Sequence, residues 1–247
     1  MGDLLEIAAA RDEWLRVLTM SDDVVRAEAA TRLTTCRAAL EIVDARLADI
    51  GYPVHPIVRS IDRDHLDEVQ RTLAEADIAL PPLLALVWQI VGSVSVLEFG
   101  RYRHVSFWSD RIGPTEACTD GLHIDAPGDD DYESFVDYLI DEREGWLDSG
   151  LADEGEPFEF PIAPDDLHKD NVSGGDPYGL AEGSGTWDHR VTQFAWRCRP
   201  VSAPDGAPDL LSYLRTAILE CGCFPGFFGV AAYEPDRQYL TADLPIF

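Results

Sequence analysis

Residues 80–99, LPPLLALVWQIVGSVSVLEF, constrain the fold of this chain more than any other stretch of its sequence. Pro81 and Pro82 suit the first turn of a helix, where a missing N–H costs little and the fixed φ is already helical. The residues that follow are apolar on nearly every side of the predicted helix, which is typical of a helix buried on most sides. Gly92 is placed to end this helix, and the β-branched and aromatic residues 93–99 predict a strand. We therefore expect a buried helix that leads directly into a sheet.

Two helices are predicted within residues 1–50. The first is indicated by Leu4, Ile7, Leu15 and Leu18. The second begins after Ser21, a good N-cap that two acids follow in the first turn. Its apolar residues recur at alternating steps of four and three, and this seam consists of Val25, Ala29, Leu33, Cys36, Leu40, Val43, Leu47 and Ile50. The seam could form a homodimer through Val25–Ile50 or pack within its own chain, and both interpretations stay open here.

Helices and strands are mixed after residue 50. Asp62 is predicted to cap a helix whose apolar stripe is formed by residues 66, 69, 73 and 76. Acids at positions 129–131 precede a further predicted helix, because negative charge is favoured at a helix N-terminus. The remaining predicted elements are strands at His104–Trp108, Leu122–Ile124, Phe158–Pro161 and Val191–Cys198, and a last helix at Pro208–Cys221. The tail at 224–233 is expected to finish against the sheet.

The formal net charge of -27 is large for a chain of 247 residues. Repulsion from phosphate groups disfavours binding to nucleic acid and to an anionic membrane surface. The charge could reflect the adaptation of the whole composition to solubility. Alternatively, it could form an acidic face for a basic partner, whose association it would accelerate.

The cysteines Cys36, Cys118, Cys198, Cys221 and Cys223 are odd in number and scattered. No signal peptide is recognised, so this pattern predicts a cytoplasmic protein with free core thiols rather than a disulfide framework. No stretch reaches the roughly 20 apolar residues that a membrane span needs.

The loop at residues 164–178, PDDLHKDNVSGGDPY, gathers acids, a histidine, a serine and paired glycines. A hydrolase would need a base that is oriented by an acid and lies within hydrogen-bond reach of a nucleophile. His168, with Asp166 or Asp170 and with Ser173, could supply these groups. A structured turn explains the same composition, because Asn and Asp bond local N–H groups and glycine tolerates positive φ. The turn is the preferred interpretation, since the serine lies outside a GxSxG elbow.

A second group of acids follows His123 and Asp125. On a strand these two side chains would share one face, as metal ligands could. The spacing of the acids at 129–131 and 133 does not match an EF-hand loop. A solvated helix start is therefore the preferred interpretation, and no metal site is predicted. Aromatic residues are assigned to core packing by default, and the set comprises Trp88, Phe107, Trp108, Trp196, Phe224, Phe227 and Phe228.

The segment Leu80-Pro81-Pro82-Leu83 through Gly92 resembles the SMI1/KNR4-like, or SUKH, superfamily. In that superfamily a helix precedes a leucine-proline start of a second helix, and a glycine-bearing turn and a strand follow. The downstream DDLHKDNVSGGDPY turn and GCFPGF segment are similar to a group of bacterial proteins associated with it. The resemblance is best at residues 60–99 and leaves out the first 50 residues. It implies an α+β fold with a mostly antiparallel sheet flanked by helices, organised as an N-terminal helical hairpin (1–50) and an α+β domain (51–247).

The resemblance also implies a binding role, because bacterial members are similar to immunity proteins that neutralise a cognate toxin, often a basic nuclease. It carries over no catalytic residue and no cofactor. The candidate partner-binding residues are Asp129, Asp130, Asp131, Glu133, Asp165, Asp166, His168 and Asn171. The expected partner is a toxin protein, and neither nucleic acid nor a membrane. The alternatives are a hydrolase built on Asp166, His168 and Ser173, and a scaffold or oligomerisation module built on the seam at 25–50.

Overall fold

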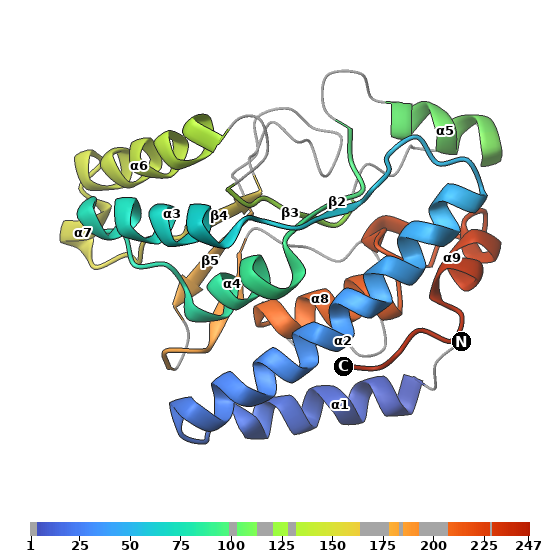
Figure 1. The fold of residues 1–247 in the computed structure, drawn as a ribbon, viewed down its shortest axis with the longest axis horizontal. Helices are drawn as coiled ribbons and strands as arrows, with labels where there is room; N and C mark the ends of the chain where they lie inside the picture. Colours follow the sequence, from blue (N-terminus) through green and yellow to red (C-terminus); the bar gives the residue numbers. More distant parts are fainter. Residues whose placement is uncertain are drawn as a thin grey trace.

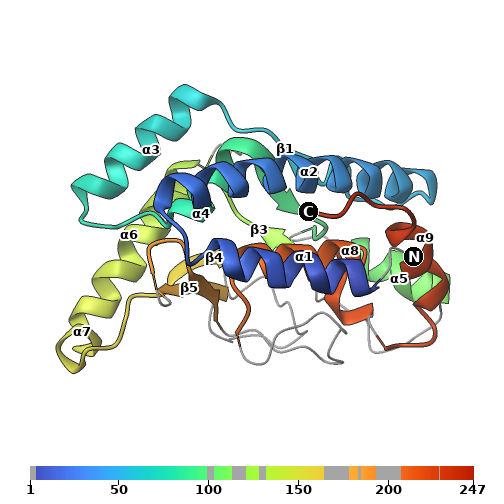
Figure 2. The ribbon, with the colours of Figure 1, turned by 90° about the horizontal axis from the view of Figure 1, so that it is seen from below.

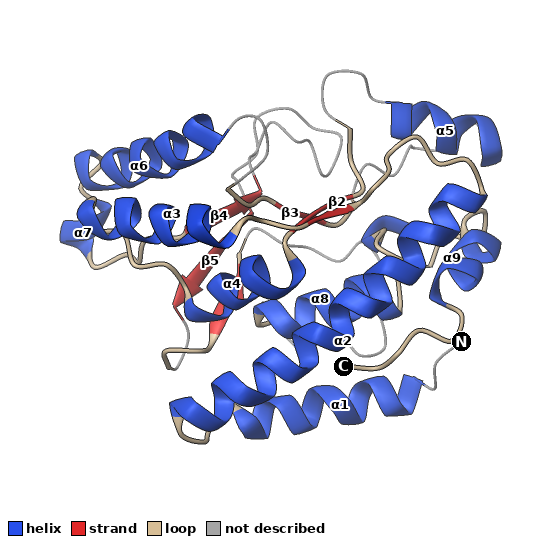
Figure 3. Ribbon diagram, viewed as in Figure 1, coloured by secondary structure: helices blue, strands red, loops and turns tan. Residues whose placement is uncertain are grey.

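The structure is a computed structural model that describes residues 4–98, 103–112, 121–127, 132–163, 178–182, 185–192, 207–227 and 229–247. It has an α+β fold in which helices surround two small antiparallel sheets (Figures 1 and 3). This arrangement confirms the predicted fold class and divides the sheet into two three-stranded parts. None of the described helices combines the length and the apolar character that crossing a membrane requires.

The described elements follow one another along the chain as helices, 3-10 or π segments (η) and short strands. The helical elements are α1 (Leu4–Val17), α2 (Asp22–Asp49), α3 (Arg63–Glu75), α4 (Pro82–Leu86), η1 (Val87–Val91), α5 (Arg103–Ile112), α6 (Tyr132–Asp148), α7 (Leu151–Glu154), α8 (Leu210–Leu219), η3 (Pro225–Phe227) and α9 (Glu234–Thr241). The strands are β1 (Val58–Arg59), β2 (Ser93–Ser95), β3 (His123–Ile124), β4 (Phe160–Ala163), β5 (Tyr178–Glu182) and β6 (His189–Val191).

The stretch at 80–99 folds as predicted, with one addition. The helix starts as α4 and continues as a π-helical turn, η1. Gly92 ends it at φ 96° and ψ -158°, and its N–H donates to the carbonyl oxygen of Val87 at 2.9 Å. β2 follows at once but covers only Ser93–Ser95 of the predicted strand. Every residue of the main apolar stripe is buried, and these residues are Leu83, Leu84, Val87, Trp88 and Val91.

Trp88 ties this helix to both sheets. Its side chain is 1% exposed, and Nε1 donates to the backbone oxygen of Asp125, just after β3, at 2.8 Å. The ring meets Phe135 of α6 edge to face at 6.0 Å between centroids and lies 6.2 Å from the ring of Phe160 on β4. The assignment of Trp88 to the core is therefore confirmed.

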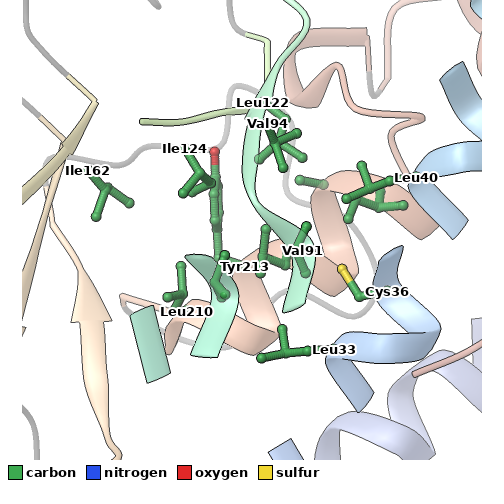
Figure 4. Close-up of a cluster of buried hydrophobic side chains, with 14 of the residues drawn as sticks. Leu33, Cys36, Leu40, Val91, Val94, Leu122, Ile124, Ile162, Leu210 and Tyr213 are labelled. Carbon is green, nitrogen blue, oxygen red and sulfur yellow. The ribbon is translucent and has the colours of Figure 1, made fainter. Parts of the chain in front are cut away.

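The apolar seam of α2 is buried within its own chain, against α4, η1, α8 and α9. Figure 4 shows Leu33, Cys36 and Leu40 of α2 facing Val91 of η1 and side chains from α8. The seam residues from Val25 to Leu47 are at most 1% exposed. A homodimer of this folded chain would therefore have to use another surface.

α1 lies along α2 and α8 (Figures 1 and 2) and buries Ile7, Trp14 and Val17. The helix predicted from Leu4, Ile7, Leu15 and Leu18 is confirmed, although Leu15 itself is 37% exposed and the neighbouring Trp14 takes the buried position. One cluster of buried side chains extends from Ile7 to Phe247. The proposed boundary at residue 50 stays a prediction.

The two sheets have the strand orders β1-β2-β3 and β4-β5-β6, and every pairing is antiparallel. Val94 on the central strand pairs with Val58 on one side and Ile124 on the other. The sheets meet where Asp125 N donates to the backbone oxygen of Ile162 at 2.8 Å. Side chains of β2, β3, β4 and α8 fill the space around this junction (Figure 4).

Three other sequence predictions have clear outcomes. Asp62 caps α3 as predicted, accepting from Asp64 N at 2.9 Å. The prediction of a strand at His104–Trp108 is wrong, because these residues belong to helix α5. His104 and Trp108 lie four positions apart, so they share one side of the helix, and both are buried. Of the strand predicted at 191–198, only its first residue lies in β6, and residues 193–198 lie outside the described part.

The end of the chain differs from the prediction, because the tail continues as η3 and α9. α9 packs on α2, and the segment just before the tail meets the first sheet where Leu122 N donates to Cys223 O at 2.8 Å. The last predicted helix is confirmed as α8. The thiols Cys36, Cys221 and Cys223 are free and buried as predicted, whereas Cys118 and Cys198 lie outside the described residues.

Candidate functional site

Most of the predicted partner-binding residues lie outside the part of the chain that the structure describes. These are Asp129, Asp130, Asp131, Asp165, Asp166, His168 and Asn171, and the same holds for Asp170 and Ser173 of the hydrolase hypothesis. Glu133 is placed in the first turn of α6, where only its backbone is described. A candidate site must therefore be built from other residues.

His123 and Asp125 are described, and both serve the junction between the sheets. The buried His123 of β3 places Nδ1 2.9 Å from Ser95 Oγ on β2. The carboxylate of Asp125 accepts from Ala126 N at 3.0 Å. Within the described residues no group of three or more His, Cys, Asp or Glu side chains could hold a metal ion.

The pairing of Ser95 with His123 has the residue types of a nucleophile and a base, but its hydrogen bonds give it a different role. Ser95 Oγ donates to the backbone oxygen of Leu97 and accepts from Leu97 N, both at 3.1 Å. With its proton held by a carbonyl, the hydroxyl can only accept from the imidazole. A general base must instead take the proton from the nucleophile. The pair therefore fixes the turn after β2.

A different set of residues consists of the exposed acids on the neighbouring helices α3, α6 and α7, which we call the acidic layer. α3 packs beside α6, and α6 leads into α7, at the edge of the molecule away from α1 and α9 (Figures 1 and 2). Its exposed carboxylates are Asp64, Asp67, Glu68, Glu75, Asp137, Asp141, Glu144, Asp148, Asp153 and Glu154. The buried faces of these helices carry the apolar residues, so the acids point to solvent by helical periodicity.

The carboxylates on α6 and α7 greatly outnumber the basic residues there. Residues 135–156 hold eight carboxylates and a single arginine, Arg143. None of the exposed acids on these two helices forms an ion pair with a residue of the described ranges. Arg143 is directed elsewhere, with Cζ 4.3 Å from the centroid of the Trp146 ring. Uncompensated charges of one sign on a shared surface produce a field that extends about one Debye length, roughly 8 Å at physiological salt.

Two large apolar side chains are exposed within the acidic layer. Leu147 at the end of α6 is 50% exposed, and Leu151 at the start of α7 is 40% exposed. Exposure rises along α6, because Val136 is 4% exposed and lies over the core, whereas the C-terminal end projects beyond it (Figure 1). The two leucines therefore lack a partner in the core.

An aromatic group includes Trp146, the residue that precedes Leu147 in α6. The ring of Trp146 lies 5.8 Å from that of Phe158, and the Arg143 guanidinium stacks over both. Trp146 Nε1 and Arg143 Nη1 are buried and have no hydrogen-bond partner. Tryptophan and arginine beside exposed apolar residues, with a charged rim, form the arrangement found at the centre of many protein interfaces.

This surface has the physical requirements of a docking site for a positively charged protein: a field for steering and an apolar centre to bury. The sequence pattern alone would have placed Leu147 inward, since it continues the stripe of Val136 and Ile140. The available signal was the length of α6, which continues eight residues past Ile140 and thus beyond the core.

Comparison of the chain with protein-family models, with curated proteins and with solved structures returns no match. The resemblance to the SUKH superfamily therefore stays a prediction.

Proposed function

We propose that this protein is a binding protein that captures a basic protein partner through the acidic layer, with Leu147 and Leu151 at the centre of the contact. The observation that carries the proposal is the exposure of these two leucines inside a field of unpaired carboxylates. A protein of net charge -27 gains nothing in solubility from exposed leucines. Their exposure is explained when a partner covers them.

Charge and apolar surface contribute differently to such binding. The carboxylates raise the rate of encounter with a cationic protein and repel acidic competitors. The leucines and the neighbouring aromatic group supply burial, at about 25 cal/mol per Å² of apolar surface removed from water. The field therefore governs the association rate and the choice of partner, and the apolar centre governs the dissociation rate.

The class of partner follows from the proposed SUKH relationship. Under it, the protein is an immunity protein that acts in the cytoplasm, and its partner is a toxin that it neutralises by occlusion. A basic nuclease is the partner that fits the charge best, because a surface that binds nucleic acid must be cationic. The acids at 129–131, 165 and 166 belong to this proposal as additional contact residues.

The two other functions proposed from sequence have no comparable support. The hydrolase hypothesis rests on Asp166, His168 and Ser173, which lie outside the described residues. The oligomerisation hypothesis rests on the seam of α2, whose side chains are buried against the rest of the chain.

The proposal is tested by purifying the full chain with each toxin-like protein that is encoded beside its gene. We expect one of these proteins to bind and to be neutralised in a growth assay. Its association rate should fall at least tenfold when the salt concentration is raised from low to well above physiological, since screening removes the steering. If no neighbouring gene product binds or is neutralised at either salt concentration, the proposal is wrong.

Charge-reversal variants on α6, with a control variant on α2, test whether the partner binds at the acidic layer. Asp141→Lys and Glu144→Lys change exposed, unpaired acids of α6, whereas Asp23→Lys changes an exposed acid at the start of α2. The two α6 variants should slow association, and the α2 variant should have a smaller effect because it lies on a different helix layer (Figure 1).

A further inference from the structure

The end of α6, all of α7 and the segment after α7 protrude from the molecule. None of the residues 140–159 is buried, whereas Leu139 just before this stretch and Phe160 just after it lie in the core. Figure 2 shows α7 at the outer end of α6, at the edge of the molecule. We call residues 140–159 the α6–α7 projection. The exposed side chains of Leu147 and Leu151 lie at its tip, where α6 passes into α7.

Hydrogen bonds order this tip. Ser149 Oγ donates to the backbone oxygen of Trp146 at 2.8 Å and accepts from Leu151 N at 3.4 Å. One hydroxyl therefore joins the end of α6 to the start of α7. Gly150 adopts the left-handed conformation between the two helices, at φ 80°, and its N–H donates to Leu147 O at 3.2 Å. The turn that separates the two leucines is thus fixed by the chain itself.

A stack of side chains holds the base of the projection. The rings of Trp146 on α6 and Phe158 after α7 lie 5.8 Å apart, and the Arg143 guanidinium lies over both, at 4.3 and 5.4 Å from their centroids. The stack ties the outgoing chain to the returning chain. An element that is ordered before it meets a partner avoids much of the entropy loss that ordering on binding would cause.

We propose that the α6–α7 projection inserts into a concave, positively charged site on the partner, with Leu147 and Leu151 entering first, and that Ser149 is the positioning residue of its tip. This inference rests on the proposed function and adds the shape of the partner surface. A convex element buries its exposed apolar side chains fully only against a concave surface of matching shape. Asp148 and Asp153 at the tip are exposed, and carboxylates that enter a contact need a paired cation, so the concave site must be basic.

The acids of α3 have a different role in this arrangement. α3 belongs to the body of the molecule, because Leu66, Val69 and Leu73 on its inner face are buried. Its carboxylates stay outside the concave site and act on the partner through their field, which extends roughly 8 Å at physiological salt. Insertion therefore predicts contact at the projection and steering without contact at α3.

Hydrogen exchange of the full chain, free and bound to the partner found among the neighbouring gene products, locates the contact. Amides 149–156 lie in turns and in a helix of four residues with few buried contacts, so they exchange through local opening in the free chain. We expect the partner to slow their exchange at least tenfold and to leave that of α3 unchanged. Equal protection of α3 and the projection would show that the acidic layer docks as a flat face, and this result would overturn the insertion.

Ser149→Ala tests the positioning role. Loss of the hydroxyl should raise the dissociation rate about three- to tenfold, the effect of one lost hydrogen bond, and should leave the association rate unchanged because no charge changes. Ser149→Thr keeps a hydroxyl and should restore the wild-type rate. Thr19→Ala is the matched control, because Thr19 Oγ1 donates to Arg16 O at 2.8 Å in the exposed turn between α1 and α2. Both alanine variants should lower Tm by a similar small amount, but only Ser149→Ala should speed dissociation.

The possible failures are distinguishable. If no neighbouring gene product binds the wild type, the proposed function fails and this inference fails with it. If a partner binds the wild type and leaves Ser149→Ala at the wild-type rate, the positioning role alone is wrong. The same conclusion holds if Thr19→Ala speeds dissociation as much as Ser149→Ala does, because the effect is then one of general stability.

Discussion

Replacing Gly92 by alanine should unfold or severely destabilise the protein, because no side chain fits where η1 passes into β2. Gly92 has φ 96° and ψ -158°, a region that is essentially restricted to glycine and costs other residues about 1–3 kcal/mol. A Cβ at this position would lie 1.9 Å from the carbonyl oxygen of Arg59 and 2.8 Å from its carbon. Both atoms are backbone, so no side-chain rotation relieves the contact.

The steric part of the cost follows from the neighbouring strand. To restore an ordinary contact, β1 must move away from Gly92, which breaks the pairing of Arg59 with Ser93 and of Val58 with Val94. Each lost backbone hydrogen bond costs about 1 kcal/mol, and the forced repacking costs about 1–3 kcal/mol more. Together with the backbone strain and the two lost pairings, we expect a loss of about 4–8 kcal/mol, which is a large part of the roughly 5–15 kcal/mol of a typical domain.

Two glycines provide matched controls. Gly150 has φ 80° but nothing within 4 Å of its hypothetical Cβ, so Gly150→Ala should cost only the backbone strain, about 1 kcal/mol. Gly145 lies within α6 at ordinary helical φ with open space around it, so Gly145→Ala should stabilise by about 0.5–1 kcal/mol. Urea unfolding of the three variants gives the comparison. Equal destabilisation by Gly92→Ala and Gly150→Ala would refute the steric argument.

Three further outcomes are expected. Trp14→Phe should cost about 1–3 kcal/mol in urea unfolding, because buried Asp209 loses the indole donor at 2.9 Å, and a loss below 0.5 kcal/mol would contradict this role. Burial raises the pKa of the Cys36 thiol, so a thiol reagent at pH 8 should modify Cys36 only as fast as the protein unfolds. Burial also lowers the pKa of His104 in the folded protein. The stability of the fold that depends on neutral His104 is therefore fully present above the unfolded pKa of about 6.5, and it decreases as the pH falls below that value. His104→Gln should therefore reduce the acid sensitivity of Tm between pH 7 and 5, and an unchanged pH profile would argue against it.

The parts of the fold that were predictable are those in which one local pattern decides the structure. The stripe of α4 and η1, the cap at Asp62 and the seam of α2 each follow from side-chain periodicity or from a single hydrogen bond. Local patterns also explain the errors. Residues 104–108 fit a strand by composition, but the separation of His104 and Trp108 by four residues suits α5 equally, and packing of Trp108 against Phe224 decides the matter.

Long-range contacts account for what the sequence could not show. The face of α1 is set by Trp14, whose partner Asp209 lies 195 residues away, so the position of Leu15 could not be inferred from α1 alone. The same holds for Arg215, which looks like an ordinary helix residue until its burial is known. The acidic layer could be suspected from charge, but its apolar centre depends on α6 extending past the core. The residues predicted at 129–131 and 165–171 are not among those described and remain predictions.

The most direct test of the proposed partner surface compares two matched variants, Leu147→Arg and Met20→Arg. For each variant, the dissociation constant of the complex with the proposed basic partner is measured. Leu147 lies within the acidic layer and is 50% exposed, whereas Met20 lies at the turn between α1 and α2 and is 53% exposed. Each substitution therefore adds the same charge at a site of similar exposure. Leu147→Arg should raise Kd about 30-fold or more, the effect of removing a central contact worth about 2 kcal/mol. Met20→Arg should leave Kd nearly unchanged. Equal dissociation constants for Leu147→Arg and the wild type would show that the partner binds elsewhere.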